Sequence, residues 1–189
     1  MNVRETNYTV LSSVSFTSGS VSLRPVQQRD IEMIRIWRNA QMEVLRQSSP
    51  ITEEQQVLYF DKFVWPLKEE NEPKQVLLAI ERDGSLIGYG GLVDISWPDK
   101  RAEVSFLLDS DIEGIEAEKT SVFLAFLELM ATAVGQELGL KKLWTETYAF
   151  RQSHINTLEK AGFVQEGRLR EHVVVDGVRV DSVVHGMLI

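Results

Sequence analysis

A glutamate in the middle of a predicted strand is the first residue that could carry chemistry. Apolar and polar residues alternate over residues 101–108, which places Glu103, Ser105 and Leu107 on one face of the strand. A carboxylate is unusual inside a strand, and a positioned carboxylate can take a proton from a reacting group. The alternative is a glutamate that faces solvent and pairs with Arg101. The residue types alone leave both interpretations open.

The segment that follows this strand is unusually acidic. Residues 109–118 contain five acidic side chains and no basic one, and a long apolar helix is predicted directly after them. A helix N-terminus presents unpaired N–H donors to anions such as phosphate. Acids placed there stabilise the helix by roughly 0.3–1 kcal/mol each, but they also repel phosphate. The segment is therefore either a well-capped helix start or an anion site with repelling side chains, with Lys119 as the nearest compensating cation.

The other candidates for acid–base chemistry or metal binding are the three histidines, His154, His172 and His185. Their spacing does not match a metal site, so no metal is expected. His154 could exchange protons near neutral pH, because the reference pKa of histidine is about 6.5; the alternative is a surface histidine without a role. The chain has no cysteine, which excludes disulfides, a cysteine zinc site and a cysteine nucleophile.

Charge and apolar patterning narrow the class of protein further. The 189 residues include 20 basic and 28 acidic ones, which gives a formal charge of −8. A chain this acidic repels phosphate backbones, so general nucleic-acid binding and binding to anionic membranes are not expected. The longest apolar run, 122–127, is far shorter than the ~20 residues of a membrane span. The N-terminus lacks the apolar stretch of a signal peptide, so we expect a cytoplasmic protein.

The elements that must position these residues follow from periodicity, caps and turns. Residues 1–20 form either a tail or an extra leading strand, and residues 21–189 form one domain. The order β-α-α-β-β-β-α-β-α-β-β predicts an α/β (α+β) fold with a mostly antiparallel sheet. Strands are predicted at 21–24, 76–82, 86–95, 101–108, 142–148, 163–175 and 178–189. Helices are predicted from residue 30 onward and at 52–63, 117–138 and 152–160.

Several short motifs stand at places that are typical of one enzyme family. They are Trp37-Arg38-Asn39, Leu86-Ile87-Gly88, Ala102-Glu103-Val104-Ser105-Phe106, and the segments 158–163 and 166–170. No single motif is decisive, but their order and spacing over residues 21–189 are fairly specific. The chain resembles the GNAT superfamily of acetyl-CoA-dependent N-acetyltransferases, most closely the branch of the ribosomal-protein alanine N-acetyltransferases.

The resemblance implies a mixed, mostly antiparallel sheet with helices on both faces. The sheet would splay apart between its fourth and fifth strands, and acetyl-CoA, the co-substrate, would enter the gap. Of the family's loop before the long helix, only Gly114 matches, and Glu116 replaces a second small residue. The pyrophosphate would bind backbone amides at the helix start, those of Gly114, Ile115, Glu116, Ala117, Glu118 and Lys119.

The resemblance also implies roles for side chains and backbone groups in acetyl transfer. Glu103 matches the family glutamate that takes the proton of the amine, directly or through water. Backbone N–H groups near Leu107 and Leu108 would bind the thioester oxygen as it becomes negative. Both roles depend on the strands parting beside residues 103–108.

Two positions depart from the family pattern on the helix predicted at 152–160. Leu158 stands where many members have a tyrosine that protonates the leaving thiolate, so this acid is missing or lies elsewhere. His154 could take over that proton transfer. Arg151 could contact a CoA phosphate and compensate for the acidic loop.

The acceptor is expected to be a primary amine, and Arg38 and Asn39 could face it. The family branch favours a protein N-terminus. The Trp-Arg-Asn segment, together with Val44-Leu45-Arg46 and the helix start at residues 51–54, also resembles amino-sugar N-acetyltransferases. A nucleotide-linked amino sugar would need basic residues in the cleft, and the negative net charge favours an N-terminal or small cationic amine. A catalytically silent GNAT-like binding module is the alternative from another class. The oligomeric state stays open, with a homodimer as one alternative.

Overall fold

An eight-stranded sheet forms the frame of the protein, and a computed structural model describes its residues 3–189. The strand order is β1-β2-β3-β4-β5-β6-β8-β7, and every neighbouring pair is antiparallel except β5 and β6. The expected mixed, mostly antiparallel sheet is therefore confirmed. The strands are β1 (Phe16–Ser18), β2 (Val21–Pro25), β3 (Val76–Arg82), β4 (Ser85–Ser96), β5 (Arg101–Leu108), β6 (Lys142–Tyr148), β7 (Val164–Val175) and β8 (Val178–Leu188).

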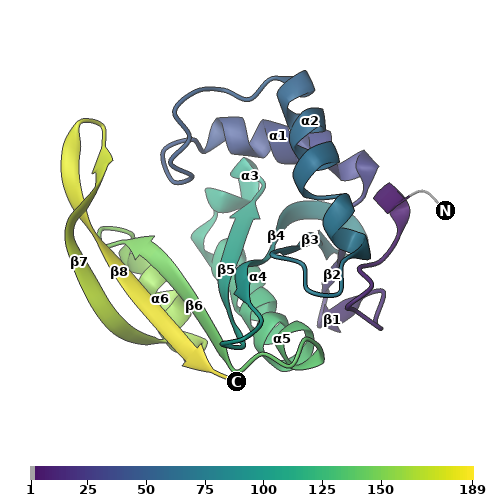
Figure 1. Cartoon of the computed structure of the whole chain (residues 1–189). Coiled ribbons are helices and arrows are strands. Elements are labelled where there is room, and N and C mark those ends of the chain that lie inside the picture. Colours follow the sequence, from purple (N-terminus) through teal and green to yellow (C-terminus); the bar gives the residue numbers. More distant parts are fainter. Residues whose placement is uncertain (1–2) are drawn as a thin grey trace.

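The parallel pair in the middle of the sheet is short and then opens. β5 and β6 are paired only from Arg101 opposite Lys142 to Glu103 opposite Trp144. On its other side β5 stays paired with β4 as far as Leu108. Figure 1 shows the two strands diverging from their short contact. Since β1 precedes the strands predicted from residue 21 onward, β5 and β6 are the fourth and fifth of those strands. The expected splay is thus present, and Glu103 lies at its apex.

Helices cover both faces of the sheet, as expected (Figure 1). On one face lie α1 (Ile31–Ala40) and α2 (Glu53–Phe63), and their apolar residues share a buried cluster with Tyr89 and Leu107. The spacing of Ile31, Ile34 and Trp37 predicts this buried side of α1, and all three are buried. The elements of the other face are α4 (Glu116–Leu129), α5 (Gly135–Glu137) and α6 (Gln152–Lys160); the short α3 (Ser110–Glu113) precedes α4.

The long helix predicted at 117–138 is interrupted. A π-helical turn, Met130–Val134, separates α4 from α5, and Gly139 ends the run with a φ of +67°. The segment is apolar on nearly every side, so its sequence has no alternation of apolar and polar faces. The change from α-helical to π-helical pitch therefore leaves no signal in the sequence. Gly139 is in the left-handed region that glycine adopts without strain, as expected for a C-cap.

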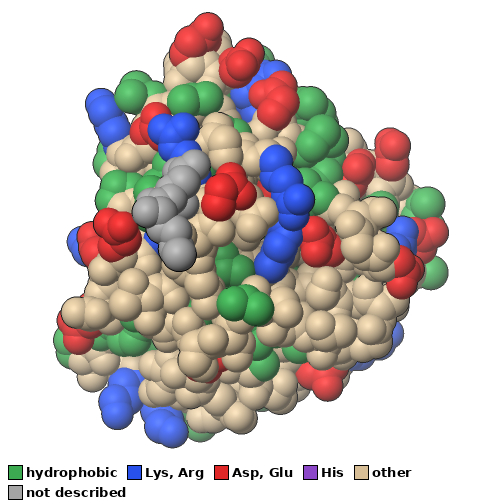
Figure 2. Space-filling view, turned by 90° about the vertical axis from the view of Figure 1, so that its right-hand side faces the viewer, with side chains coloured by type: hydrophobic (Ala, Val, Ile, Leu, Met, Phe, Trp, Pro, Cys, Tyr) green, Lys and Arg blue, Asp and Glu red, His purple; other side chains and the backbone are tan. Residues whose placement is uncertain are grey.

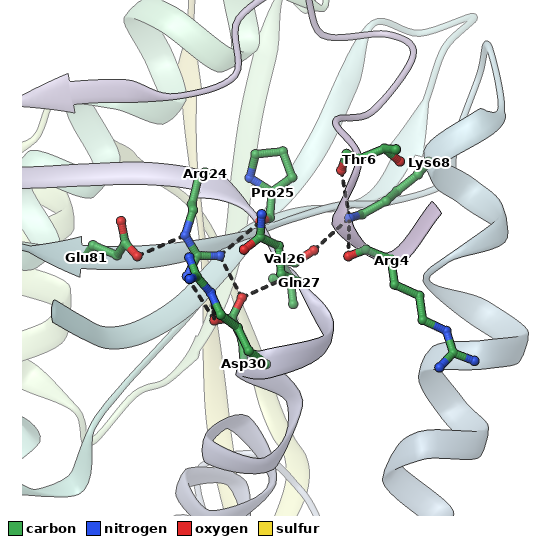
Figure 3. A network of polar contacts seen from close by, with 10 residues as sticks. Arg4, Thr6, Arg24, Pro25, Val26, Gln27, Asp30, Lys68 and Glu81 are labelled. Carbon is green, nitrogen blue, oxygen red and sulfur yellow. Dashed lines mark hydrogen bonds and ion pairs between the residues drawn. The ribbon is translucent and has the colours of Figure 1, made fainter. Parts of the chain in front are cut away.

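The N-terminal segment is fastened to the sheet by buried side chains. Tyr8 is 1% exposed, and its hydroxyl accepts a hydrogen bond from the Leu77 amide at 2.9 Å. The Lys68 ammonium donates to the carbonyls of Arg4, Thr6 and Val26 (Figure 3). Residues 1 and 2 of the predicted N-terminal segment lie outside the described residues.

The distribution of surface charge and the length of the helices can be compared with what nucleic-acid binding and membrane insertion require. On the face that carries the N-terminal residues, acidic and basic side chains are interspersed rather than gathered by sign (Figure 2). Among residues 3–189, no helix is long and apolar enough to cross a membrane.

Candidate active site

Two adjoining cavities lie on the side of the sheet that α1 and α2 cover. The larger has a volume of about 610 Å³ and is lined by α1, α2, the loop between them and strands β3 to β5. The smaller, of about 320 Å³, holds Glu103 and residues of β6. Arg46 lines both cavities. Val93, which lies opposite Glu103 in the sheet, and Ser105, which shares its face, line the larger one. One acceptor molecule could therefore contact both cavities.

Glu103 has an environment suited to taking up a proton. It receives no hydrogen bond from any described residue, and burial together with Asp94 and Glu146 raises its pKa to about 7. Arg101 pairs with Asp99 instead, at 3.5 Å, so the alternative of a Glu103–Arg101 pair is wrong. A carboxyl whose pKa is near the working pH is a suitable general base, because both of its protonation states are accessible.

Glu146, the second carboxylate of the smaller cavity, is held in the ionised state. Arg46 donates a hydrogen bond to it, and the Arg46 guanidinium also lies 5.3 Å from the centre of the Tyr148 ring. Burial, the largest single influence, raises the pKa of Glu146, but the hydrogen bond and charge of Arg46, together with smaller contributions from neighbouring groups, outweigh it and hold the pKa below its usual value. The two carboxyls of this cavity therefore have pKa values shifted in opposite directions. Glu103 is suited to accept a proton, whereas Glu146 provides a fixed negative charge.

Sequence reasoning missed Arg46 and Glu146 as site residues. Glu146 carries the same signal as Glu103, a glutamate inside a predicted strand. Arg46 lies in a loop without periodicity, and its partner is 100 residues away in the chain. No local pattern could have paired them.

The two residues expected to face the acceptor have different roles. Arg38 lines the larger cavity and donates to the Tyr89 hydroxyl at 2.8 Å. Asn39 does not line it; its amide oxygen accepts from the Ile51 amide at 2.8 Å and from Gln47 at 2.9 Å. Its amide nitrogen donates to the Ile51 carbonyl at 2.9 Å. The expected acceptor contact of Asn39 is thus replaced by a structural role, because these bonds hold the loop that borders the cavity.

Only part of the expected row of amides is available at the start of α4. The Gly114 amide donates to the Ser110 carbonyl, the Ile115 amide to the Ile112 carbonyl and the Lys119 amide to the Ile115 carbonyl. The first-turn amides of Glu116, Ala117 and Glu118 have no carbonyl partner within the helix, and the Ile115 side chain does not cap them. An anion at this helix start would therefore bind residues 116–118.

Two of the acidic side chains at this helix start are engaged in contacts of their own. Glu116 accepts hydrogen bonds from the hydroxyls of Ser153 and Thr120. Glu118 forms an ion pair with Arg82 at 3.0 Å. These contacts reduce the repulsion that the free carboxylates would exert on a phosphate.

Glu113 holds both cations that were expected to compensate for the acidic loop. Its carboxylate lies 2.5 Å from the Lys119 ammonium and 3.5 Å from the Arg151 guanidinium. The three groups therefore bring two positive charges to the side of the helix start where phosphate would bind. Lys119 and Arg151 therefore lie close together, and both already pair with the carboxylate of Glu113.

The backbone of β5 provides one donor beside the opening. The Asp109 amide bonds to the Ile87 carbonyl of β4 at 2.8 Å, so by strand alternation Leu107 also directs its N–H towards β4. The backbone groups of Leu108 therefore point away from β4, to the side where β5 is no longer paired with β6. There the Leu108 carbonyl accepts a hydrogen bond from the Gln41 side chain at 2.7 Å. The expected donor of Leu108 fits a thioester oxygen, whereas that of Leu107 is used inside the sheet.

His154 is not the surface histidine that the sequence suggested. It is 9% exposed and stacks on Phe123, with ring centres 4.4 Å apart. Burial and the nearby positive charges of Arg151 and Lys119 lower its pKa to about 3. A neutral imidazole is a poor acid near pH 7, so these surroundings argue against the expected role of His154 in protonating the thiolate. Leu158 is fully buried and carries no proton to donate.

These features fit the binding of acetyl-CoA. Neighbouring elements carry three such features: the opening between β5 and β6, the first-turn amides of residues 116–118, and the cations at positions 119 and 151. The described residues contain no group of three or more histidine or acidic side chains that could hold a metal ion.

Comparison with known proteins agrees with this geometry. A model of the acetyltransferase (GNAT) domain family matches residues 23–184. The SPbeta prophage-derived uncharacterized N-acetyltransferase YokL of Bacillus subtilis (strain 168) is 25% identical over 176 residues, which cover 91% of this chain and 92% of the relative. The finer resemblance to ribosomal-protein alanine N-acetyltransferases stays a prediction.

Among solved structures, the chain is similar in fold to spermidine N-acetyltransferase from Vibrio cholerae in complex with CoA and spermine. The TM-score is 0.75 at 18% identity, over 90% of this chain and 96% of the other. A dodecameric structure of that enzyme in an intermediate state matches with a TM-score of 0.71 at 19% identity, over 90% of this chain and 95% of the other. With the family match over most of its length, the chain belongs to the GNAT family of acetyltransferases, which use acetyl-CoA as co-substrate.

Proposed function

We propose that the protein transfers an acetyl group from acetyl-CoA to a primary amine, with Glu103 as the base. The observation that carries this proposal is the position of Glu103, at the apex of the β5–β6 opening and in a cavity next to the larger one. Its carboxyl has no hydrogen-bond partner among the described residues and has a pKa of about 7. It is therefore free to take a proton from a bound amine.

The chain's groups would act in sequence on the acceptor. Acetyl-CoA, when bound, would supply the acyl group, and one carbon–nitrogen bond would replace one carbon–sulfur bond. The second proton of the nitrogen would pass through water to the departing CoA thiolate. Glu103 takes a proton from the acceptor ammonium, directly or through water, because only the free amine is a nucleophile. The Leu108 N–H donates to the acyl oxygen as negative charge develops on it. Glu146 stays ionised and keeps Arg46 in place beside the base.

The cation-bearing side of the α4 start would hold the phosphates of CoA. The amides of residues 116–118 donate to the pyrophosphate, and Lys119 and Arg151 provide charge. Glu113 must give up at least part of its contact with both cations when phosphate binds. This exchange would weaken the affinity for CoA relative to a site without the carboxylate.

Three acceptor classes remain within this proposal: a protein N-terminal amine, an amino sugar and a small amine. The family branch supports the first and the Trp37-Arg38-Asn39 segment the second. The third is supported by the spermidine N-acetyltransferases of similar fold. A volume of about 610 Å³ suits a small molecule or the end of a peptide. A homodimer also stays a prediction.

The test begins with binding and ends with turnover. Acetyl-CoA at 100 times its dissociation constant should add about 2.7 kcal/mol to the free energy of unfolding, which raises the melting temperature by several degrees. An amine screen with detection of the released thiol then identifies the acceptor class. Thiol release that depends on an amine supports the proposal. Binding of acetyl-CoA without release to any amine would favour the catalytically silent binding module, and no binding at millimolar acetyl-CoA would contradict both.

A further inference from the structure

The larger cavity has a charge opposite to that of the whole chain. Its only charged lining residues among those described are Arg38 and Arg46, and no carboxylate lines it. The remaining polar lining is neutral and includes Gln47, Ser48 and Gln55. The lining of this cavity is therefore positively charged, although the whole chain has a net charge of −8.

Of the two arginines that line the larger cavity, Arg38 has the less complete neutralisation of its charge. Arg46 pairs with Glu146, whereas Arg38 has no carboxylate partner among residues 3–189. Its guanidinium donates a hydrogen bond to the neutral Tyr89 hydroxyl, at 2.8 Å. A half-buried charge without a counter-charge is costly to keep out of water. An anion in the cavity would supply the missing charge and could accept two parallel hydrogen bonds from the guanidinium.

The lining of the cavity also indicates how far an anion at Arg38 would lie from Glu103. Tyr89, which holds Arg38, and Val93, which lies opposite Glu103, both line the cavity and stand four residues apart on β4. Four strand residues span about 13 Å of backbone, and the long side chains of Arg38 and Glu103 bridge part of that distance. A molecule that touches Arg38 and Glu103 is therefore longer than a free α-amino acid.

We propose that the acceptor is an elongated amine that carries an anionic group, a carboxylate or a phosphate, with the anion at Arg38 and the amine at Glu103. This inference rests on the proposed acetyl transfer and specifies its substrate class. It differs from a polyamine acceptor, because the larger cavity has no acidic side chain to pair with a second ammonium group. In this proposal the local charge of the cavity, rather than the net charge of the chain, governs which acceptor binds.

The experiment compares amines that differ only in the anion. Glucosamine 6-phosphate is paired with glucosamine, and 6-aminohexanoate with 6-aminohexanamide; spermidine and glycine represent a cationic and a short amine. Calorimetric binding to the free protein and thiol release with acetyl-CoA are both measured. We expect one anionic probe to bind about 10- to 100-fold more tightly than its neutral partner. Which of the two pairs shows the difference distinguishes phosphate from carboxylate.

Variants of Arg38 test the origin of the preference. Arg38→Gln should reduce the ratio between anionic and neutral partners to about one, and Arg38→Lys should restore part of it. Arg29→Gln is the matched control, because Arg29 is exposed, lies outside both cavities and, among the described residues, pairs only with Asp30, at 3.9 Å. It removes the same charge and should keep the ratio.

The outcomes separate this inference from the proposed function. Equal binding of both partners in each pair, tighter binding of spermidine, or no binding of any anionic probe would overturn the inference. A loss in Arg38→Gln that is equal for the anionic and neutral partners would also overturn it. A calorimetric preference that disappears in Arg38→Gln, without thiol release from any amine, would support the anion site and contradict acetyl transfer instead.

Discussion

Two regions of the molecule hold charged side chains away from water, and they do so in opposite ways. The first, which we call the N-terminal network, consists of Arg24, Asp30, Glu81 and Lys68 (Figure 3). Asp30 accepts two hydrogen bonds from Arg24, at 2.7 and 2.9 Å, and another from the Gln27 amide at 2.7 Å. Each of these charged groups has partners, and the network joins the N-terminal residues, β2, β3 and the start of α1.

The second region is the cleft with Glu103 and Arg38. Glu103 has no hydrogen-bond donor among the described residues, and Arg38 has a neutral partner but no carboxylate. The two regions differ in whether each charge has its hydrogen-bonding partners within the chain. A buried charge whose hydrogen bonds are complete holds the fold together, whereas a half-buried charge with unused capacity is available to a substrate.

The largest effect should come from the base. Glu103→Gln keeps the size of the side chain and removes its proton-accepting capacity, so turnover at neutral pH should fall about 10²- to 10⁴-fold. The loss should shrink as the pH rises and free amine becomes abundant. Turnover of the wild type should rise with pH through about 7, the pKa of Glu103. A pH–rate profile of both proteins checks this, and full activity of Glu103→Gln over the whole range would show that another group is the base.

The N-terminal network should respond in stability. Lys68→Met leaves the carbonyls of Arg4, Thr6 and Val26 without this donor. We expect the free energy of unfolding to fall by about 2–4 kcal/mol, as measured by denaturant unfolding. Lys62→Met is the matched control, since Lys62 is exposed on α2 and should change stability by less than about 0.5 kcal/mol. Equal effects of the two variants would mean that the network does not hold the N-terminal segment.

An intermediate effect is expected where Glu113 holds two cations. Arg151→Ala should raise the Michaelis constant for acetyl-CoA about tenfold and leave that for the acceptor nearly unchanged. Glu113→Gln should act in the opposite direction, because it releases Lys119 and Arg151 to bind phosphate. Initial-rate kinetics with each substrate varied in turn measure both. Parallel changes in both Michaelis constants would indicate a structural role for the cluster.

The smallest effect concerns pH and stability at Glu103. Its pKa is raised from 4.5 to about 7 in the folded protein, so between these values the folded state binds more protons than the unfolded state. Stability therefore falls as the pH rises through this window. Glu103→Gln should remove this contribution and make the protein slightly more stable than the wild type at pH 7 and above. Thermal unfolding of both proteins between pH 4.5 and 8 checks the sign, and an equal slope in both would contradict the raised pKa.

Much of the fold could be predicted because its signals are local. The capping box at residues 52–55 is present, with the Thr52 hydroxyl accepting from the Gln55 amide and the Gln55 side chain accepting from the Thr52 amide. The alternation in β5 correctly placed Glu103 and Leu107 on the face opposite to Val104. These signals lie within a few residues of one another, so the sequence carries them directly.

The site was less predictable, because its groups come from distant segments. The composition of the acidic loop before α4 predicts side chains that repel phosphate, but Glu116 bonds to Ser153, and Glu113 pairs with Lys119 and Arg151. Asn39 has the residue type of an acceptor ligand, yet loop residues use its hydrogen-bonding groups. His154 has a residue type that favours proton transfer, and its burial argues against this role. In each case the residue type was suggestive, and its neighbours decided the role.

The sequence by itself determined the order of the elements, the faces of strands and helices and the position of Glu103 within a strand, because period and capping depend on neighbours along the chain. The tertiary structure alone decided which charges meet and which remain without a partner. Arg46 pairs with Glu146 across 100 residues, while Arg38 has no carboxylate partner among residues 3–189. The energy and pKa of a charge depend on all the groups around it and on its distance from water, and only the folded chain brings those groups together.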